Sequence, residues 1–373
     1  MKQTLLILFL FVMALSLCPR GLCQDDSVTL LSQWSPKLTS NSFLTGFNQA
    51  WLRNHYGSQW TRNWDEAEAR RMIEACSDNG AKVLRMWLFE GLSFEGVEWD
   101  GDPSKSAYGY SGTRTRPTSL SAEKLANIER FLVLAKEKDV AVYLTFFDAN
   151  IYSQNNPAKT QRKNEWWNVL NDKYGAGTGF RANVLLPILQ VCQRHREAVF
   201  AVDLVNEINA LVKKDWFENG WAGARLFVSR WRNFIRGLIA DMPVSASFGH
   251  HDAVDCMLDS RLRADAVDFY DFHLYNNRGS IPDDDDVKEL AERLEIPIYL
   301  GEFGQKSKAF DDALQSRVLR NFINASKECG LAGAFAWRLS DIRRGHNPEA
   351  RFSFEAFGRW RPAMEVFRTL STQ

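Results

Sequence analysis

Short apolar runs alternate along the chain with longer segments in which apolar residues recur every three or four positions. Near-continuous apolar runs are typical of strands covered on both faces, as in parallel sheets. The longer pattern is typical of helices with one buried face. The predicted strands are Ser42–Asn48, Lys82–Trp87, Val140–Phe147, Val199–Val205, Val244–Gly249, Ala266–Asn276, Pro297–Gly304 and Leu331–Leu339. The predicted helices are Asp65–Asp78, Ala122–Lys138, Val184–Ala198, Leu226–Asp241, Asp285–Leu294, Leu314–Glu328 and Pro362–Leu370.

Alternation of strands with helices predicts parallel βα units, and eight such units predict a closed (β/α)8 TIM barrel forming one domain. Two long polar segments, Phe89–Ser121 and Ala149–Phe180, follow the second and third strands. Because the loops at this end of a barrel build its active site, we expect them to form cleft walls. The competing fold is an open doubly wound sheet, which usually has a Gly-rich turn after its first strand. The turn here, Gly46-Phe47-Asn48-Gln49, does not fit that pattern.

Composition narrows the class of protein without naming a reaction. The 373 residues carry a formal net charge of zero, with 25% charged and 45% hydrophobic residues, as in ordinary globular proteins. Nothing in this balance favours nucleic acid or an anionic surface as a partner. The 13 tryptophans are an excess with two interpretations, namely core packing or a cleft in which flat rings lie against sugars.

The N-terminus has the pattern of a targeting segment. Lys2 precedes a short apolar run, Leu5–Leu17, and Gly21-Leu22-Cys23 offers small residues for cleavage before Gln24. Residues 1–23 are therefore predicted to be a signal peptide and residues 24–373 the catalytic domain. A lipoprotein anchor at Cys18 or Cys23 fits less well, because leucine precedes each cysteine. We expect a secreted or periplasmic monomer with no membrane span after cleavage.

Four cysteines remain in the mature chain: Cys76, Cys192, Cys256 and Cys329. Their wide spacing lacks the pairs that bind zinc. Cys76, Cys192 and Cys329 fall in helix-like segments, which favours buried free thiols over disulfides, although an oxidising compartment leaves disulfides open. Neither a structural metal nor a cofactor is predicted.

Polar residues stand at the ends of two predicted strands. The run Val199–Val205 stops at Asn206-Glu207, and Pro297–Gly304 carries Glu302. An acid at the end of an apolar strand is costly unless it lies in a polar site. Two barrel strands that each deliver a carboxylate match the requirement of glycoside hydrolysis, which uses a carboxyl group on each side of the scissile bond.

Further residues complete a recognisable set in chain order: Arg85, Asn206-Glu207, His273-Leu274-Tyr275, Glu302 and Trp337. With these markers the chain resembles the retaining glycoside hydrolases of clan A, and most closely glycoside hydrolase family 5, the cellulase and β-mannanase group. The resemblance covers the whole predicted barrel. It implies that Glu207 is the acid/base and Glu302 the nucleophile, with no cofactor.

The resemblance also assigns roles around the two glutamates. Arg85 and Tyr275 would keep Glu302 ionised by charge and hydrogen bonding. Burial and the charge on Glu302 predict a raised pKa for Glu207.

The remaining markers would contact the sugar. Asn206 would bind the sugar 2-hydroxyl, His273 would bind Glu207 or a sugar hydroxyl, and Trp337 would lie under the sugar at the cleavage site. The family usually has a histidine at the end of the third strand, where this chain has Asp148. Asp148 itself, His250 or His251 are the candidates to replace it.

The leading functional hypothesis is an endo-acting β-1,4-glycanase on mannan or glucan, with a β-linked polysaccharide or oligosaccharide as its only partner. An exo-acting β-glycosidase of the same clan and a non-catalytic carbohydrate-binding barrel are the alternatives. A metal-dependent barrel hydrolase would need paired ligands at strand ends. Only His250-His251 suggests such a pair, and adjacent side chains point to opposite faces.

Overall fold

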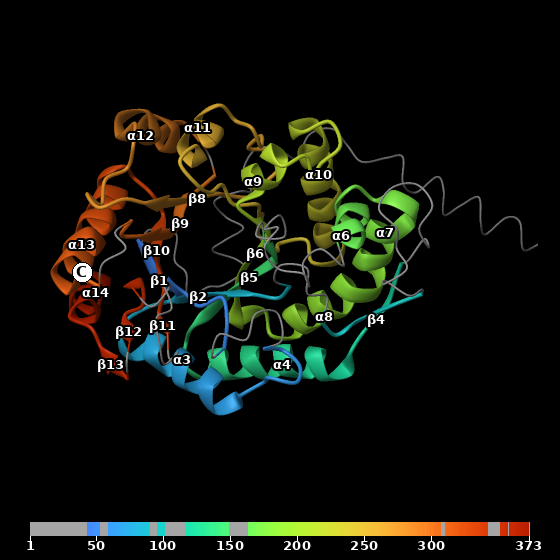
Figure 1. The fold of residues 1–373 in the computed structure, drawn as a ribbon, viewed down its shortest axis with the longest axis horizontal. Coiled ribbons are helices and arrows are strands. Elements are labelled where there is room, and N and C mark those ends of the chain that lie inside the picture. The colour runs from blue at the N-terminus through green and yellow to red at the C-terminus, as the bar shows by residue number, and fades with distance from the viewer. Residues whose placement is uncertain are drawn as a thin grey trace, which may run out of the picture.

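The computed structural model describes residues 43–52, 59–89, 95–100, 116–148, 163–294, 296–306, 310–341, 351–356 and 358–372 (Figure 1). The predicted signal peptide, residues 1–23, lies outside the described residues, as do Cys18 and Cys23 and parts of both long segments. The prediction of a signal peptide therefore stays a prediction.

Eight parallel strands form one sheet in the order β7-β6-β5-β2-β1-β10-β9-β8. Phe248, just beyond β7, bridges to Phe272 in β8, so the two ends of this order meet and the sheet closes. The predicted (β/α)8 barrel is confirmed. Its strands are β1 Leu44–Asn48, β2 Val83–Trp87, β5 Ala141–Asp148, β6 Val199–Asn206, β7 Val244–Ser245, β8 Tyr270–Tyr275, β9 Ile298–Gly304 and β10 Gly333–Trp337.

Apolar side chains on both faces explain why these runs form barrel strands. Every residue of β6 is buried, as are those of β5. A cluster of aromatic rings fills the inside of the barrel, where Phe200 and Phe335 pack edge to face at 5.8 Å between centroids. Tyr143, Phe269 and Tyr299 complete this cluster. Part of the aromatic content is therefore core packing, as one of the two interpretations expected.

Helices surround the barrel and turn their apolar faces toward it (Figure 1). Side chains cap several of them, since Asp65, Ser121 and Asp311 each accept a hydrogen bond from a backbone N–H in the first helical turn. The helices are α3 Glu66–Asp78, α4 Ala122–Glu137, α6 Lys163–Leu170, α7 Ala176–Phe180, α8 Leu186–Arg194, α9 Ile208–Lys213, α10 Trp221–Leu238, α11 Ala253–Leu258, α12 Asp284–Arg293, α13 Asp312–Glu328 and α14 Ala363–Ser371.

The structure adds elements that the hydrophobic pattern does not predict. The first long segment contains β3 (Val97–Trp99) paired antiparallel with β4 (Pro117–Leu120), and the second contains α6 and α7. A small sheet joins β11 (Ser340–Asp341), β12 (Glu355–Ala356) and β13 (Arg359–Trp360). These elements are too short to carry a periodicity of their own, so contacts with the rest of the fold decide them.

The fifth barrel strand, β7, is shorter than predicted. It ends at Ser245, and beyond it the backbone N–H of Ser247 donates both to the carbonyl oxygen of Val205 in β6, at 3.2 Å, and to the carboxylate of Asp203, at 3.1 Å. After the bridge at Phe248, the chain places Gly249 and His250 beside the end of β6, where they contact Asn209 and Glu207.

The four cysteines of the described chain, Cys76, Cys192, Cys256 and Cys329, are buried free thiols, as predicted. None of the helices in the described part of the chain combines the length and the apolar character of a membrane span.

Candidate active site

The predicted site residues come together at the carboxyl ends of the barrel strands. In a parallel barrel these ends lie on one face, so residues far apart in the sequence become neighbours. Arg85 lies on β2, Asp148 and Asn206 end β5 and β6, and Glu207 follows directly. His273 and Tyr275 lie on β8, Glu302 on β9, and Trp337 ends β10.

Arg85 is the centre of this network. Its side chain is fully buried, and Nη1 donates to Oε1 of Glu302 at 2.6 Å and to Oδ1 of Asn48 at 3.1 Å. Nη2 donates to Asp203 and to Asn206, at 2.5 and 2.9 Å. A buried guanidinium is stable only with such partners, so it ties β1, β2, β6 and β9 together while it places positive charge against Glu302.

Glu302 accepts hydrogen bonds on both carboxylate oxygens. Arg85 occupies Oε1, and the hydroxyl of Tyr275 donates to Oε2 at 2.7 Å. Burial raises the pKa of Glu302 above its usual value and the charge of Glu207 adds to this, while His273 and Arg85 oppose it. The hydrogen bonds hold the carboxylate in one orientation.

Glu207 projects from the turn between β6 and α9. Its backbone has the left-handed conformation, with φ of 61° and ψ of 52°, and its N–H donates to Oγ of Ser247 at 3.0 Å. Oε1 lies 3.2 Å from Nδ1 of His273, and Oε2 lies 3.2 Å from Nε2 of His250. Two imidazoles therefore hold the two oxygens of this carboxyl group.

Gly249 lies directly against the Glu207 side chain. A Cβ atom at Gly249 would lie 2.2 Å from Cγ and Cδ of Glu207. The carboxyl group thus occupies space that only a glycine at this position leaves open.

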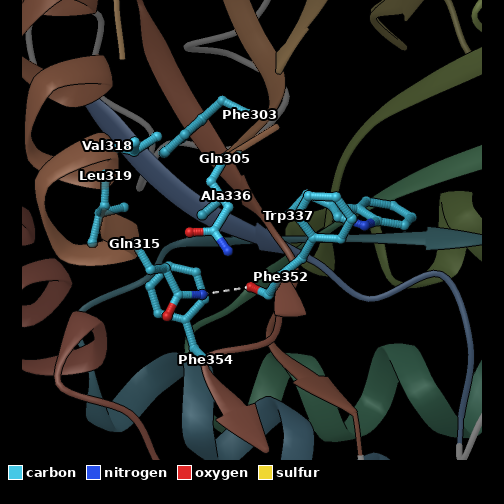
Figure 2. Close-up of a pocket in the computed structure, with 10 residues that line it drawn as sticks. Phe303, Gln305, Gln315, Val318, Leu319, Ala336, Trp337, Phe352 and Phe354 are labelled. Carbon is cyan, nitrogen blue, oxygen red and sulfur yellow. Dashed lines mark hydrogen bonds between the residues drawn. The ribbon is translucent and has the colours of Figure 1, made fainter. Parts of the chain in front are cut away.

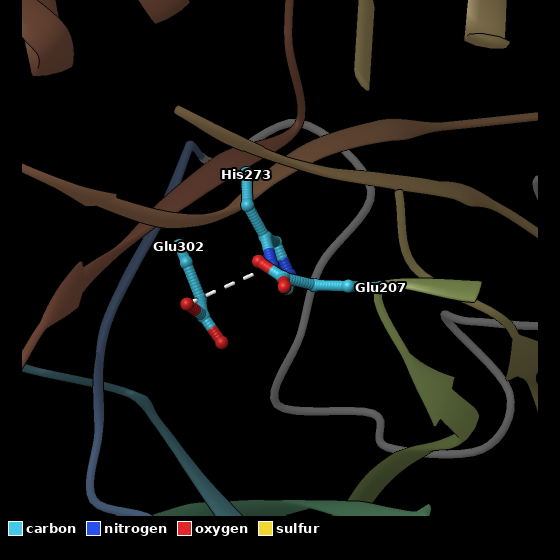
Figure 3. Close-up of side chains that lie close together, drawn as sticks. All are labelled: Glu207, His273 and Glu302. Atoms are coloured by element: carbon cyan, nitrogen blue, oxygen red, sulfur yellow. Dashed lines mark hydrogen bonds and ion pairs between the residues drawn. The ribbon is translucent and has the colours of Figure 1, made fainter. Parts of the chain in front are cut away.

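The two carboxyl groups approach each other from facing walls of the barrel (Figure 3). An oxygen of Glu207, a nitrogen of His273 and an oxygen of Glu302 lie within 4.8 Å of one another. Retaining glycosidases hold their carboxyl groups about 5–5.5 Å apart, and inverting ones about 6.5–9.5 Å apart. An approach of two carboxylate oxygens to within 4.8 Å is closer to the retaining spacing than to the inverting one.

The expected raised pKa of Glu207 is wrong for the free site. Burial by itself raises this pKa, but the hydrogen bond and charge of His273, with the charges of His250 and Arg85, outweigh it and lower the pKa. His273 shows the converse: burial lowers its pKa, yet Glu302, Asp271 and Glu207 together raise it to about 10. In the free site His273 therefore carries the proton, and Glu207 is ionised.

Asp148, the first candidate to replace the third-strand histidine, ends β5 beside Asn206. Its Oδ1 accepts a hydrogen bond from Nδ2 of Asn206 at 3.3 Å, while Oδ1 of Asn206 accepts from Arg85. These two contacts fix which way the Asn206 amide points. His250 contacts Glu207 from the opposite side, and His251 is exposed.

Trp337 belongs to an aromatic cluster at the mouth of the barrel. Its ring meets Trp51 and Trp87 edge to face, at 5.9 and 5.4 Å between centroids. Phe352 packs beside it, with its carbonyl oxygen accepting a 2.7 Å hydrogen bond from the Gln315 amide (Figure 2). Trp51 and Trp87 are site residues that were not predicted, because their only signal in the sequence is a tryptophan next to a strand end.

One group of side chains in the described residues has the spacing of a metal site. It consists of Glu207, His273 and Glu302. Arg85 already places a full positive charge 2.6 Å from Glu302. A second cation at this point would be repelled, so the donor set suits a proton better than a metal ion.

No protein-family model and no curated protein matches this chain. Its structure is similar to that of the β-mannanase from the blue mussel Mytilus edulis, with a TM-score of 0.61 and 15% identity, covering 89% of this chain and 92% of that one. The β-1,4-D-mannanase of Cryptopygus antarcticus has a TM-score of 0.60 and 16% identity, and the match covers 89% of this chain and 90% of that one. An exo-β-1,4-mannosidase from an Opitutaceae bacterium has a TM-score of 0.60 and 16% identity, and the match covers 88% of this chain and 59% of that one. At these identities, what the proteins share with this chain is the barrel fold.

Proposed function

We propose that this chain is a retaining β-glycoside hydrolase of the family 5 type that cleaves β-1,4-linked mannan. The observation that carries the proposal is the pair of carboxyl groups, Glu207 and Glu302, whose oxygens lie within 4.8 Å at the carboxyl end of the barrel. The likeness to barrels described as mannanases supports mannan over glucan.

Glu302 is the nucleophile in this proposal. Its carboxylate attacks the anomeric carbon, a C–O bond to the enzyme forms, and the glycosidic bond breaks. Arg85 and Tyr275 support this role, because their hydrogen bonds orient the carboxylate and stabilise its negative charge before attack.

Glu207 is the acid/base. It gives a proton to the leaving glycosidic oxygen in the first step and takes one from water in the second, when the hydroxyl oxygen displaces Glu302 from the anomeric carbon. The proton that it donates is shared with Nδ1 of His273, 3.2 Å from Oε1.

Asn206 and Trp337 bind the sugar in the cleavage position. The Asn206 amide, oriented by Arg85 and Asp148, donates to the 2-hydroxyl, an interaction that strengthens in the transition state. Trp337, held by Trp51 and Trp87, offers an apolar ring face to the C–H groups of the sugar.

Product analysis tests the substrate and the mode of action. We expect the purified protein to release short oligosaccharides from mannan and glucomannan, with little release from cellulose, mixed-linkage glucan or xylan. NMR of the first products should show the β-anomer, which is the retained configuration. An α-anomer would contradict the retaining mechanism, and absence of hydrolysis on all five polymers would contradict the activity.

An exo-acting β-mannosidase is the second candidate, and the similarity to the Opitutaceae exo-β-1,4-mannosidase favours it. Release of mannose alone from mannohexaose, without a fall in the viscosity of mannan, would identify it. We also propose that residues 1–23 direct secretion, which N-terminal sequencing of the exported protein tests through the predicted start at Gln24.

A further inference from the structure

His273 has carboxylates on both sides of its ring: Glu207 is the nearer of two at Nδ1, where Oε2 of Glu302 lies 3.6 Å away, and Asp271 faces Nε2. Nδ1 is 3.2 Å from Oε1 of Glu207, and Nε2 is 3.5 Å from Oδ1 of Asp271. Asp271 and His273 are two positions apart on β8, so both side chains point into the barrel. Asp271 is fully buried and has no role in the mechanism proposed above.

Of the two carboxylate oxygens of Asp271, Oδ1 is the one that faces His273. Its Oδ2 accepts a 2.7 Å hydrogen bond from the hydroxyl of Tyr143. Within the described chain, neither Oδ1 of Asp271 nor Nε2 of His273 has a hydrogen-bond partner of ideal geometry, and the two atoms face each other. Buried polar atoms of this kind are normally paired.

Gly301 on β9 makes this arrangement fit. A Cβ atom at Gly301 would lie only 1.7 Å from Oδ1 of Asp271. The strand is therefore open at the point where the Asp271 carboxylate enters the barrel.

We propose that Asp271 is a positioning residue that keeps a proton on Nε2 of His273, so that the proton on Nδ1 is the one that His273 exchanges with Glu207. The proposal rests on the proposed hydrolase activity and assigns the source of the catalytic proton. The buried Asp271 acts only through His273, which carries its effect to the acid/base.

The proton balance of the cycle is complete within these three residues, the sugar and water. In the free site His273 holds protons on both nitrogens and Glu207 is ionised. When the substrate binds, the Nδ1–H bond breaks and an O–H bond forms on Glu207, leaving neutral His273 with its proton on Nε2 beside Asp271. Glu207 then protonates the leaving oxygen. In the second step Glu207 takes a proton from water and returns it to Nδ1.

The direction of the charge on His273 agrees with this cycle, since its pKa is raised to about 10 while that of Glu207 is lowered. The titratable and charged groups packed around the ring all come from barrel strands or the turns beyond them. They are Arg85 (β2), Tyr143 (β5), Asp203 (β6), Glu207 (after β6), His250 (after β7), Asp271 and Tyr275 (β8) and Glu302 (β9). Carboxyl groups outnumber cations in this set, which favours a proton on His273.

Asp271→Asn is the sharpest perturbation. Tyr143 donates to Oδ2, so an asparagine keeps its oxygen on Tyr143 and turns its amide N–H toward Nε2 of His273. A donor there requires an unprotonated Nε2, which leaves the neutral ring with its proton on Nδ1. In this tautomer His273 donates a hydrogen bond to Glu207 but cannot give up the Nδ1 proton, because the ring would become an imidazolate, so Glu207 stays ionised.

Nitrogen NMR of ¹⁵N-histidine-labelled protein reads the tautomer directly. On raising the pH, wild-type His273 should lose the Nδ1 proton and keep the Nε2 proton, whereas Asp271→Asn should keep the proton on Nδ1. Tyr143→Phe retains the carboxylate and should behave as the wild type. A wild-type ring that keeps its proton on Nδ1 overturns the proposal, and this measurement needs neither a variant nor an active enzyme.

Kinetics on aryl β-mannosides give the second readout. Asp271→Asn should lower kcat/KM for poor leaving groups by about 100-fold, in the range of general-acid catalysis, and much less for 2,4-dinitrophenyl mannoside, which leaves without a proton. Equal loss on both substrates, or no loss, overturns the proposal. A wild-type protein that hydrolyses no mannoside contradicts the proposed function instead, while the NMR tautomer still decides the role of Asp271.

Discussion

Replacing Gly249 by alanine should displace the acid/base without unfolding the barrel. The new Cβ would lie 2.2 Å from both Cγ and Cδ of Glu207. Carbon atoms in contact are about 3.5–4.0 Å apart, so the carboxyl carbon must move by more than about 1 Å. The atoms that move are the end of a flexible side chain, so the folded state should lose no more than about 1–3 kcal/mol.

The substitution should reduce the catalytic rate, because the displaced carboxyl group loses its contacts with His273 and His250. A misplacement of about 1 Å in a catalytic group costs about 100-fold in rate, which corresponds to about 2.7 kcal/mol of transition-state stabilisation. We expect kcat/KM on a poor leaving group such as mannohexaose to fall by about this factor. The loss on 2,4-dinitrophenyl mannoside should be smaller, because this substrate needs no acid.

Gly237→Ala is the matched control. Gly237 lies in α10 with no atom within 4 Å of the added Cβ, and an alanine inside a helix is more stable than a glycine by about 0.5–1 kcal/mol. This variant should keep full activity and unfold at a slightly higher denaturant concentration. Full activity in Gly249→Ala, with its fold intact, would refute the assignment of Glu207 as the acid/base held by this contact.

Four further predictions test the same site. Glu302→Ala should abolish turnover, and azide should restore part of it with formation of the α-glycosyl azide; activity that survives without azide would remove Glu302 from the mechanism. Glu207→Ala should reduce hydrolysis of poor leaving groups by about 10²–10⁴-fold and spare activated aryl glycosides, so uniform loss would argue against an acid role. EDTA should leave activity unchanged, and inhibition that added metal reverses would support a metal-dependent hydrolase. The pKa of His273 is about 10 in the folded protein and about 6.5 in the unfolded chain, so its charge stabilises the fold fully below pH 6.5 and less as the pH rises toward 10. In denaturant unfolding, the difference in the free energy of unfolding between the wild type and His273→Gln should therefore shrink across that range. A difference that stays constant with pH would contradict this prediction.

The barrel was predictable from the sequence because the hydrophobic pattern of each strand and helix lies within its own segment of the chain. A strand covered on both faces is apolar along its whole length, and a helix with one buried face repeats every three to four residues. Asn206-Glu207 and Glu302 stood out for a related reason, since an acid that ends an apolar run is costly outside a polar site. Strand order then places such residues on one face of the barrel.

The protonation of Glu207 is decided by tertiary structure alone. Its pKa depends on His273, His250 and Arg85, which reach it from three other strands or their turns, and no sequence pattern gives their distances. Electrostatic interaction depends on separation and burial, and both arise only when the barrel closes. The same holds for the Asp148 contact to Asn206.

By itself, the sequence determined the eight strands and the order of the candidate residues along them, and it favoured buried free thiols for the four cysteines. The tertiary structure decided which atoms face each other: the Gly249 surface under Glu207, the Asp271 carboxylate behind His273, and the Trp51 and Trp87 rings around Trp337. The reason is physical. Burial of an apolar run is a property of the run itself, whereas a hydrogen bond or a charge interaction belongs to two groups that only the fold brings together.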